Sequence, residues 1–152
     1  MIEIEKSPTA DTRTCDWSKV TKNELFDASK KHIDDVRQGL RLFRDKLDEA
    51  SRQHDWSKIL KIHEFHEDFK TGFKTTKWFQ MHQREERHHL QDKNFVQDDV
   101  NLIDIIEMIT DCVMAGMARS GEYRKEEVSD ELLRKAFDNT IKLLLDNVKV
   151  KP

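Results

Sequence analysis

The amino-acid sequence predicts an all-α fold, a compact bundle of five helices. The 152 residues include only four glycines and two prolines, and 38% of them are charged. Along most of the chain apolar residues recur at intervals of three and four, which is the period of an α-helix with one buried face. A chain of this length is expected to form one domain with a core of its own.

The first 21 residues carry no helical period and contain Pro8 among several turn-forming residues. We therefore predict an irregular N-terminal arm at 1–21, followed by a single helical domain at 22–152. The first helix is expected to start near Lys22. Its buried stripe is predicted to consist of Ile33, Val36, Leu40, Phe43, Leu47 and Ala50.

The second helix is expected from about His54 to Phe69, because apolar residues keep a helical spacing there and Gly72 follows as a stop signal. A third helix is expected from about Thr75 to Leu90. One of its faces carries more metal-ligand side chains than an ordinary core face would: Trp78, Met81, His82, Glu85, His88 and His89.

After a polar loop, Asp98 and Asp99 are expected to cap a fourth helix that runs to Arg119. Asp104, Glu107 and Asp111 stand at positions i, i+3 and i+7 of this helix and therefore share one face.

The fifth helix is expected from Ser129 to about Val148. Its wide apolar face carries no candidate ligands, so its expected role is packing, and the face could also serve a homodimer.

The charge balance and the short apolar runs argue against several functions. The 27 basic and 30 acidic residues give a net charge of −3, which disfavours a nucleic-acid-binding domain. The longest apolar runs are too short for a signal peptide or a transmembrane helix, so no membrane association is expected. Cys15 and Cys112 are far apart and form no Cys-x-x-Cys pair, which fits reduced thiols and a cytoplasmic location.

The segment "HDWSK" contains the residues best suited to chemistry. His54 and Asp55 are adjacent, and Lys58 returns beside Asp55 after one helical turn. A neutral imidazole and a carboxylate are suitable ligands for a divalent metal, and a lysine at this spacing can face a phosphate. His32 upstream and the acidic face of the fourth helix could supply the remaining ligands, in the order H…HD…D.

This order, with its His-Asp-x-x-Lys form, resembles the HD-domain superfamily of metal-dependent phosphohydrolases. The segments "KKHIDDVR", "HDWSK", "RHHL" and "NLIDIIEMITDCVMAGMARSGE" look more closely like small uncharacterised HD-type proteins of bacteriophages and bacteria. The resemblance covers roughly residues 22–122. It implies an HD-type bundle with one metal on His32, His54, Asp55 and Asp111, and ligands for a second metal on His82, His88 and His89.

Two residues compete for the position of the terminal ligand, because Asp104 and Asp111 both lie on the acidic face. Asp111 is favoured, since Arg119 follows it by eight residues much as an arginine follows the terminal aspartate in the HD-GYP branch. The Gly-Tyr-Pro element of that branch is missing, which argues against hydrolysis of cyclic-di-GMP.

The expected function is hydrolysis of a small nucleotide or related phosphate ester, with one or two ions of Mn, Co, Ni, Zn, Fe or Mg as cofactor. Lys58 and Arg119 would hold the phosphate, with Arg84 and Arg87 as other candidates, and Glu107 would orient ligands or move a proton. The alternative is a binding module of the same fold that sequesters a nucleotide or docks on a host protein. If the protein is encoded by a phage, it would act in the host cytoplasm.

The tetrapeptide Asp-Trp-Ser-Lys also occurs in "CDWSK", after Cys15. That copy lies outside the periodic segments and has no candidate ligands at helical spacing. We therefore interpret it as a chance repeat of the tetrapeptide that follows His54.

Overall fold

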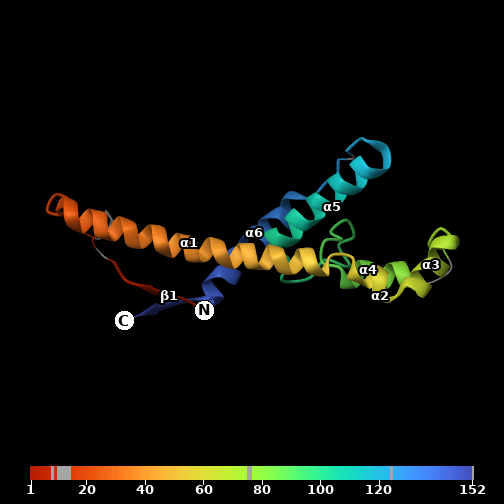
Figure 1. Cartoon of the computed structure of the whole chain (residues 1–152), viewed down its shortest axis with the longest axis horizontal. Coiled ribbons are helices and arrows are strands. Elements are labelled where there is room, and N and C mark those ends of the chain that lie inside the picture. The colour runs from red at the N-terminus through yellow and green to blue at the C-terminus, as the bar shows by residue number, and fades with distance from the viewer. Residues whose placement is uncertain (8, 10–14, 75–76, 124, 152) are drawn as a thin grey trace. The chain divides into compact units, whose positions relative to one another are not determined.

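The computed structural model describes residues 1–7, 9, 15–74, 77–123 and 125–151. Most of them are helical, which confirms the all-α prediction. None of the described helices is both long and apolar enough to cross a lipid bilayer. The elements in chain order are β1 (Ile2–Glu5), α1 (Lys22–Gln53), α2 (Trp56–Leu60), α3 (Ile62–Lys70), α4 (Trp78–Glu85), α5 (Leu102–Ser120), α6 (Asp130–Asp146) and β2 (Val148–Lys151) (Figure 1).

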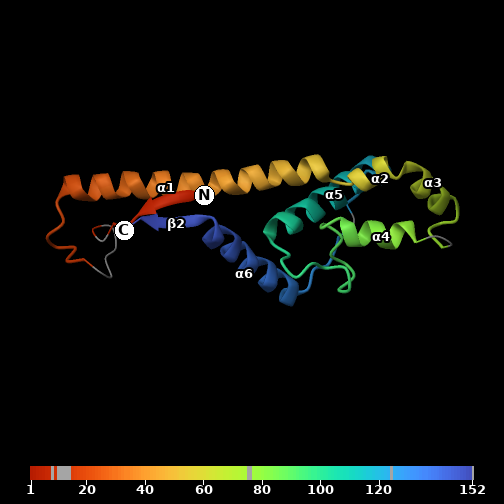
Figure 2. The same cartoon turned by 90° about the horizontal axis from the view of Figure 1, so that it is seen from below.

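The chain divides into two compact units, and the predicted boundary after residue 21 stays a prediction. One unit comprises Met1–Asp45 and Lys142–Pro152, and the other comprises Lys46–Ile141. The first unit is tied together by β1 and β2, which pair in parallel from Ile2 opposite Val148 to Glu5 opposite Lys151. Figure 2 shows the two strands side by side. No strand was expected at Ile2–Glu5, because four residues are too short to reveal a partner that is distant in sequence.

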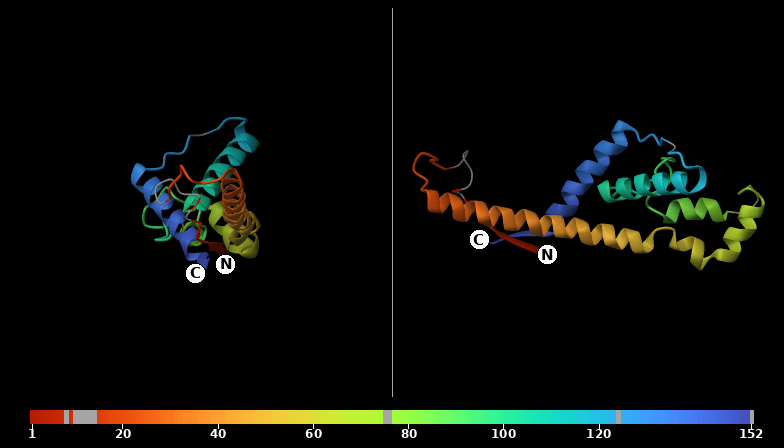
Figure 3. Two further views of the ribbon diagram at one scale, coloured as in Figure 1. Left: turned by 90° about the vertical axis from the view of Figure 1, so that its left-hand side faces the viewer. Right: turned by 45° about the horizontal axis from the view of Figure 1, so that its top comes forward.

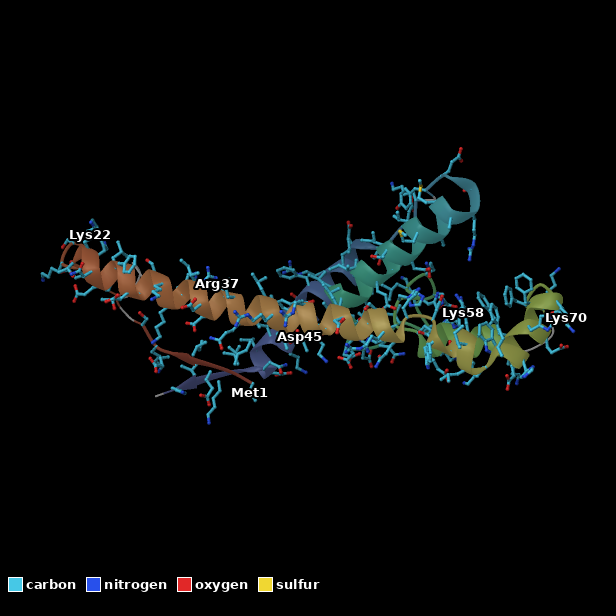
Figure 4. The ribbon with its side chains drawn as sticks, in the orientation of Figure 1. Met1, Lys22, Arg37, Asp45, Lys58 and Lys70 are labelled. Carbon is cyan, nitrogen blue, oxygen red and sulfur yellow. The ribbon has the colours of Figure 1, made fainter. Side chains whose placement is uncertain are left out.

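α1 begins with a reciprocal cap. Glu24 accepts hydrogen bonds from the Thr21 amide (2.8 Å) and hydroxyl (2.7 Å), and the Glu24 amide donates to the Thr21 hydroxyl (3.3 Å). Such capping boxes satisfy amides that would otherwise be free at a helix start. Lys22, the first residue of the helix, and Arg37, near its middle, are labelled in Figure 4.

The predicted buried stripe of α1 is only partly correct. Ile33, Val36 and Leu40 are 48%, 47% and 62% exposed, while Phe43 and Leu47 are partly buried. A helical period identifies an apolar face, but it does not say whether the same chain covers that face.

The core of the second unit lies between α5, α6 and the loop before α5. It contains Leu90, Val100, Ile105, Met108 and Ala136. The predicted caps of α5, Asp98 and Asp99, are wrong. Asn101 caps α5 instead, because its side chain accepts from the Ile103 amide (2.9 Å) and the Asp104 carboxylate accepts from the Asn101 amide (2.9 Å).

The second predicted helix is divided into α2 and α3 at Lys61, which has non-helical φ and ψ angles of −115° and 40°. α3 and α4 fold back on one another (Figure 3). Asp68 of α3 is fully buried and accepts the Phe79 amide in the first turn of α4 at 3.0 Å. Aromatic rings of α3 and α4 also stack on one another, with the ring centres of Phe65 and Trp78 4.3 Å apart.

The third predicted helix is shorter than expected. Its predicted start at Thr75 lies outside the described residues, and α4 ends at Glu85 because Glu86 is extended. His88 therefore lies in a turn and His89 directly after it, and neither belongs to a helix. The imidazole ring centres of His88 and His89 lie 4.4 Å apart.

Candidate metal centre

The turn between α1 and α2 presents His54 and Asp55. Asp55 adopts a left-handed conformation (φ 55°), which Asp and Asn tolerate better than most residues. Although Asp55 precedes the first residue of α2, its side chain does not cap that helix. The Ser57 amide donates instead to Glu86 Oε1 at 3.2 Å, from the loop after α4. The Asp55 carboxylate is therefore free for other contacts.

The loop that carries His88 and His89 is held to α5 by Arg87. The Arg87 Nε and one terminal nitrogen donate to the two oxygens of Asp104 at 2.8 and 2.9 Å, and the other terminal nitrogen donates to Asp99 at 2.9 Å. Asp104 is only 3% exposed. The paired carboxylates, Asp104 above all, outweigh burial and raise the pKa of Arg87 above its usual value.

His54, Asp55 and His88 form the first group of side chains whose ligand atoms converge, all within 4.8 Å of one another. His54 Nε2 lies 3.6 Å from Asp55 Oδ2, and His88 Nε2 lies 3.7 Å from Asp55 Oδ1. Asp111 borders this group, with carboxylate oxygens 3.6 Å from His54 Nε2 and 4.0 Å from His88 Nε2.

Glu107 lies behind both histidines of the first group. Its Oε1 lies 2.9 Å from His54 Nδ1 and forms a hydrogen bond with it. The same oxygen lies 3.0 Å from His88 Nδ1, which is close enough for an ion pair, but the two groups are not aligned for a hydrogen bond. A carboxylate in this position favours the tautomer with a proton on Nδ1. The Nε2 lone pairs of both rings are then available on the side where Asp55 and Asp111 lie.

Asp55, His82 and His89 form the second group, also within 4.8 Å of one another. His82 Nε2 lies 3.3 Å from Asp55 Oδ1 and 2.9 Å from His89 Nε2. On the far side of its ring, His82 Nδ1 is 2.8 Å from the Ser57 hydroxyl. The His82 ring is held in place by its stacking on Trp78, with ring centres 4.8 Å apart. Asp55 is therefore common to both groups.

The electrostatics of the centre favour neutral imidazoles in the second group. Burial lowers the pKa of His82, and burial together with the charges of His88 and His82 lowers the pKa of His89 to about 3. Burial also opposes protonation of His88, but the nearby Glu107 outweighs it and raises the His88 pKa. A neutral imidazole is the form that binds a metal.

Asp55 and Glu107 stay ionised despite their burial. Burial alone would raise the Asp55 pKa, but the ion pair with Lys58 and the neighbouring histidines lower it. Burial would likewise raise the pKa of Glu107, but its contacts with His88 and His54 outweigh burial and lower that pKa.

Three buried atoms of the cluster lack the hydrogen bonds that buried polar groups normally make. Among the described residues, none forms a hydrogen bond with Asp55 Oδ1, His88 Nδ1 or His88 Nε2. His88 Nδ1 lies against Glu107, whereas Asp55 Oδ1 and His88 Nε2 lie 3.7 Å apart. An unsatisfied buried acceptor is costly, and a cation between these atoms would satisfy both. The donor set of imidazole nitrogens and carboxylate oxygens also suits a divalent transition metal. The two groups could therefore hold a metal ion.

Most of the residues that the sequence nominated lie in this cluster, but His32, Asp104 and Arg119 do not. Arg119 lies on α5 and lines a pocket together with His89 and Asp111. His32 lies on α1, in the first unit, and belongs to neither group. Asp104 uses both carboxylate oxygens for Arg87 and the cap of α5, so it contributes to the fold. The nominated residues that the structure brings together, either as members of the two groups or in direct contact with one, are His54, Asp55, Lys58, His82, His88, His89, Glu107 and Asp111.

The roles of Ser57, Glu86 and the Arg87–Asp104 pair were not predicted. Each depends on a contact between segments that are distant in sequence, such as Ser57 with His82 and Glu86 with the start of α2. The one available signal was the position of Arg87 and Glu86 directly before the histidine pair. No protein-family model, curated protein or solved structure matches the chain.

Proposed function

We propose that this protein is a metal-dependent phosphohydrolase that acts on a small phosphate ester such as a nucleotide. The observation that carries the proposal is the carboxylate of Asp55, which belongs to both groups of converging ligands and has Lys58 paired to it. A carboxylate between two ligand groups is typical of two-metal sites that hydrolyse phosphate esters. The resemblance of "HDWSK" to the HD-domain superfamily supports the same reaction.

His54, His88 and Asp111 would hold one ion, His82 and His89 would hold a second, and Asp55 would contribute to both. Imidazole with carboxylate favours Mn, Fe, Co, Ni or Zn over Mg, which prefers a shell of oxygen ligands. Cations bound there would stabilise negative charge on the phosphoryl oxygens and promote ionisation of water. In this assignment His88 takes the position that the family resemblance gave to His32.

The residues of the chain orient the ligands and attract the substrate. Glu107 holds His54 and His88 with their Nε2 atoms toward the site. Lys58 brings a positive charge beside Asp55, which would attract an anionic phosphate. In the reaction a water oxygen forms a bond to phosphorus and releases a proton to solvent. The ester P–O bond breaks, its electron pair stays on the leaving oxygen, and that oxygen takes up a proton to give the alcohol.

The test is purification with Mn²⁺, Co²⁺, Ni²⁺ or Zn²⁺, followed by measurement of bound metal and of phosphate released from p-nitrophenyl phosphate and nucleoside monophosphates. We expect one to two equivalents of metal and release that depends on them. Metal binding without release from any ester would contradict the hydrolase and favour a binding module. A protein that binds no metal would contradict the site itself.

A further inference from the structure

A pocket of about 300 Å³ opens beside the His/Asp cluster. His89 and Asp111, which belong to or border the two ligand groups, line one part of it. Side chains that no ligand group uses line the rest: Gln91, Arg119, Ser120 and Glu126. A phosphate ester whose phosphorus lies at the cluster could therefore place its alcohol portion in this pocket.

The pocket is small and its wall is fixed by the fold. Its volume is at the lower end of the range of roughly 300–1,000 Å³ for small-ligand sites, which suits a small ligand. Gly116 is one of its lining residues, and a Cβ atom there would come within 2.6 Å of the Glu122 carbonyl oxygen. Only glycine allows the segment after α5 to approach this closely.

Several polar groups of the pocket have donors or acceptors that a ligand could use. Among the residues that the structure describes, none forms an ion pair with Arg119 or Glu126. Arg119 offers donors, Glu126 offers acceptors, and the Gln91 amide offers both. A ligand that has both donors and acceptors, such as a group with several hydroxyls, matches this set.

The pocket also lacks a surface on which a nucleobase could stack. No Phe, Tyr or Trp is among its described lining residues, which include the small residues Ala115 and Gly116. Base recognition normally relies on such rings. A pocket with an aromatic wall does exist at Trp78, but it shares no residue with either ligand group.

We infer that the pocket beside the cluster binds the hydroxyl-bearing part of a sugar phosphate, so that the sugar and not a base determines which ester is cleaved. The inference rests on the proposed hydrolysis for the position of the phosphorus. Arg119 and Gln91 would act as specificity-determining residues through hydrogen bonds to the sugar hydroxyls. A hydrogen bond to a charged group is worth roughly ten- to hundredfold in affinity.

The experiment compares ribose 5-phosphate, 2-deoxyribose 5-phosphate, AMP and p-nitrophenyl phosphate on the Mn²⁺-loaded protein. We expect kcat/KM to fall when the sugar loses a hydroxyl, and to be no higher for AMP than for ribose 5-phosphate. In Arg119→Met, the ratio of kcat/KM for ribose 5-phosphate to that for p-nitrophenyl phosphate should fall by roughly tenfold or more, and in Gln91→Leu by roughly two- to tenfold, because the Gln91 amide is neutral. Arg134→Met, an exposed arginine on α6 outside the pocket, should leave the ratio as it is.

Calorimetric titration with ribose 5-phosphate separates this inference from the proposed function. If no ester is hydrolysed, the proposed function fails, and binding that Arg119→Met weakens at unchanged metal content would still support the pocket. If p-nitrophenyl phosphate is hydrolysed but the ratio is the same in all variants, the inference is overturned. A preference for AMP of tenfold or more, or no binding of ribose 5-phosphate, would also overturn it.

Discussion

The two copies of Asp-Trp-Ser-Lys have similar local contacts and different surroundings. In the first copy Asp16 accepts from the Ser18 hydroxyl at 2.6 Å and pairs with Lys19 at 2.8 Å, and all three side chains are exposed. In the second copy Lys58 pairs with Asp55 in the same way. The ion pair between the aspartate and the lysine is therefore a local property of the tetrapeptide.

The serine distinguishes the copies. Ser57 is buried and its hydroxyl contacts His82, whereas Ser18 contacts its own aspartate. This leaves Asp55 to face His54, His82 and His88, which come from three segments of the chain. Four identical residues therefore form a surface turn or part of a polar centre according to the side chains that other segments provide.

The largest difference between the copies is expected for the aspartates. Asp55→Asn keeps a residue that tolerates the left-handed backbone, but it removes the charge that both ligand groups share. We expect metal affinity to fall on the order of 100-fold or more, because even outer partners of a metal site contribute 10- to 100-fold. Metal content after dialysis measures the loss. Asp16→Asn is the matched control, and equal losses in both variants would refute the comparison.

A smaller effect is expected for Glu107, which has no counterpart near Asp16 among the described residues. Glu107→Ala leaves His54 and His88 without the carboxylate that orients them. Metal affinity should fall roughly 10- to 100-fold, and Glu107→Gln should lose less because the amide oxygen still accepts a hydrogen bond from Nδ1–H. Titration with Mn²⁺ in competition with a chelator measures both. An unchanged affinity in Glu107→Ala would show that the histidines are held by other contacts.

The features of the fold and of the candidate site that depend on neighbouring residues could be predicted from the sequence. Helical period located the helices, and the spacing of His54, Asp55 and Lys58 identified one side of the centre. Glu107 and Asp111 were recognised because a helix repeats its face every three to four residues.

Contacts between distant segments could not be read in the same way. Asp104 and Asp111 share one predicted face of α5, yet Asp104 is held by Arg87, which precedes it by 17 residues, while Asp111 faces His54 and His88. The loop after α4 was another difficulty, because the extended Glu86 ends the helix without a glycine or proline as a signal. His32 was suggested by its residue type, by its position upstream of His54 and by the family resemblance, and none of these shows which side chains the fold brings together.

The lysines of the two copies should differ in substrate binding by less than the aspartates differ in metal binding. Lys58→Met removes a charge from a partly buried ion pair beside the proposed phosphate position. We expect the KM for p-nitrophenyl phosphate to rise roughly tenfold, since a charged hydrogen bond contributes about 1.5–3 kcal/mol and partial exposure reduces it. Lys19→Met, at a pair that is largely exposed, should leave KM unchanged. A rise in both variants, or in neither, would contradict a phosphate-binding role for Lys58.

The smallest difference is expected for the serines, and it tests whether the two ligand groups act separately. Ser57→Ala removes the partner of His82 Nδ1 but touches neither His54 nor His88. Loss of one hydrogen bond of about 1 kcal/mol should weaken binding of the ion at His82 and His89 by roughly fivefold. The ion at His54 and His88 should bind as before, because Glu107 and not Ser57 orients those rings. In a Mn²⁺ titration only one of two binding steps should shift, and Ser18→Ala should shift neither. A shift of both steps by the same factor would mean that the histidines form one site around Asp55, and the division into two groups would have to be abandoned.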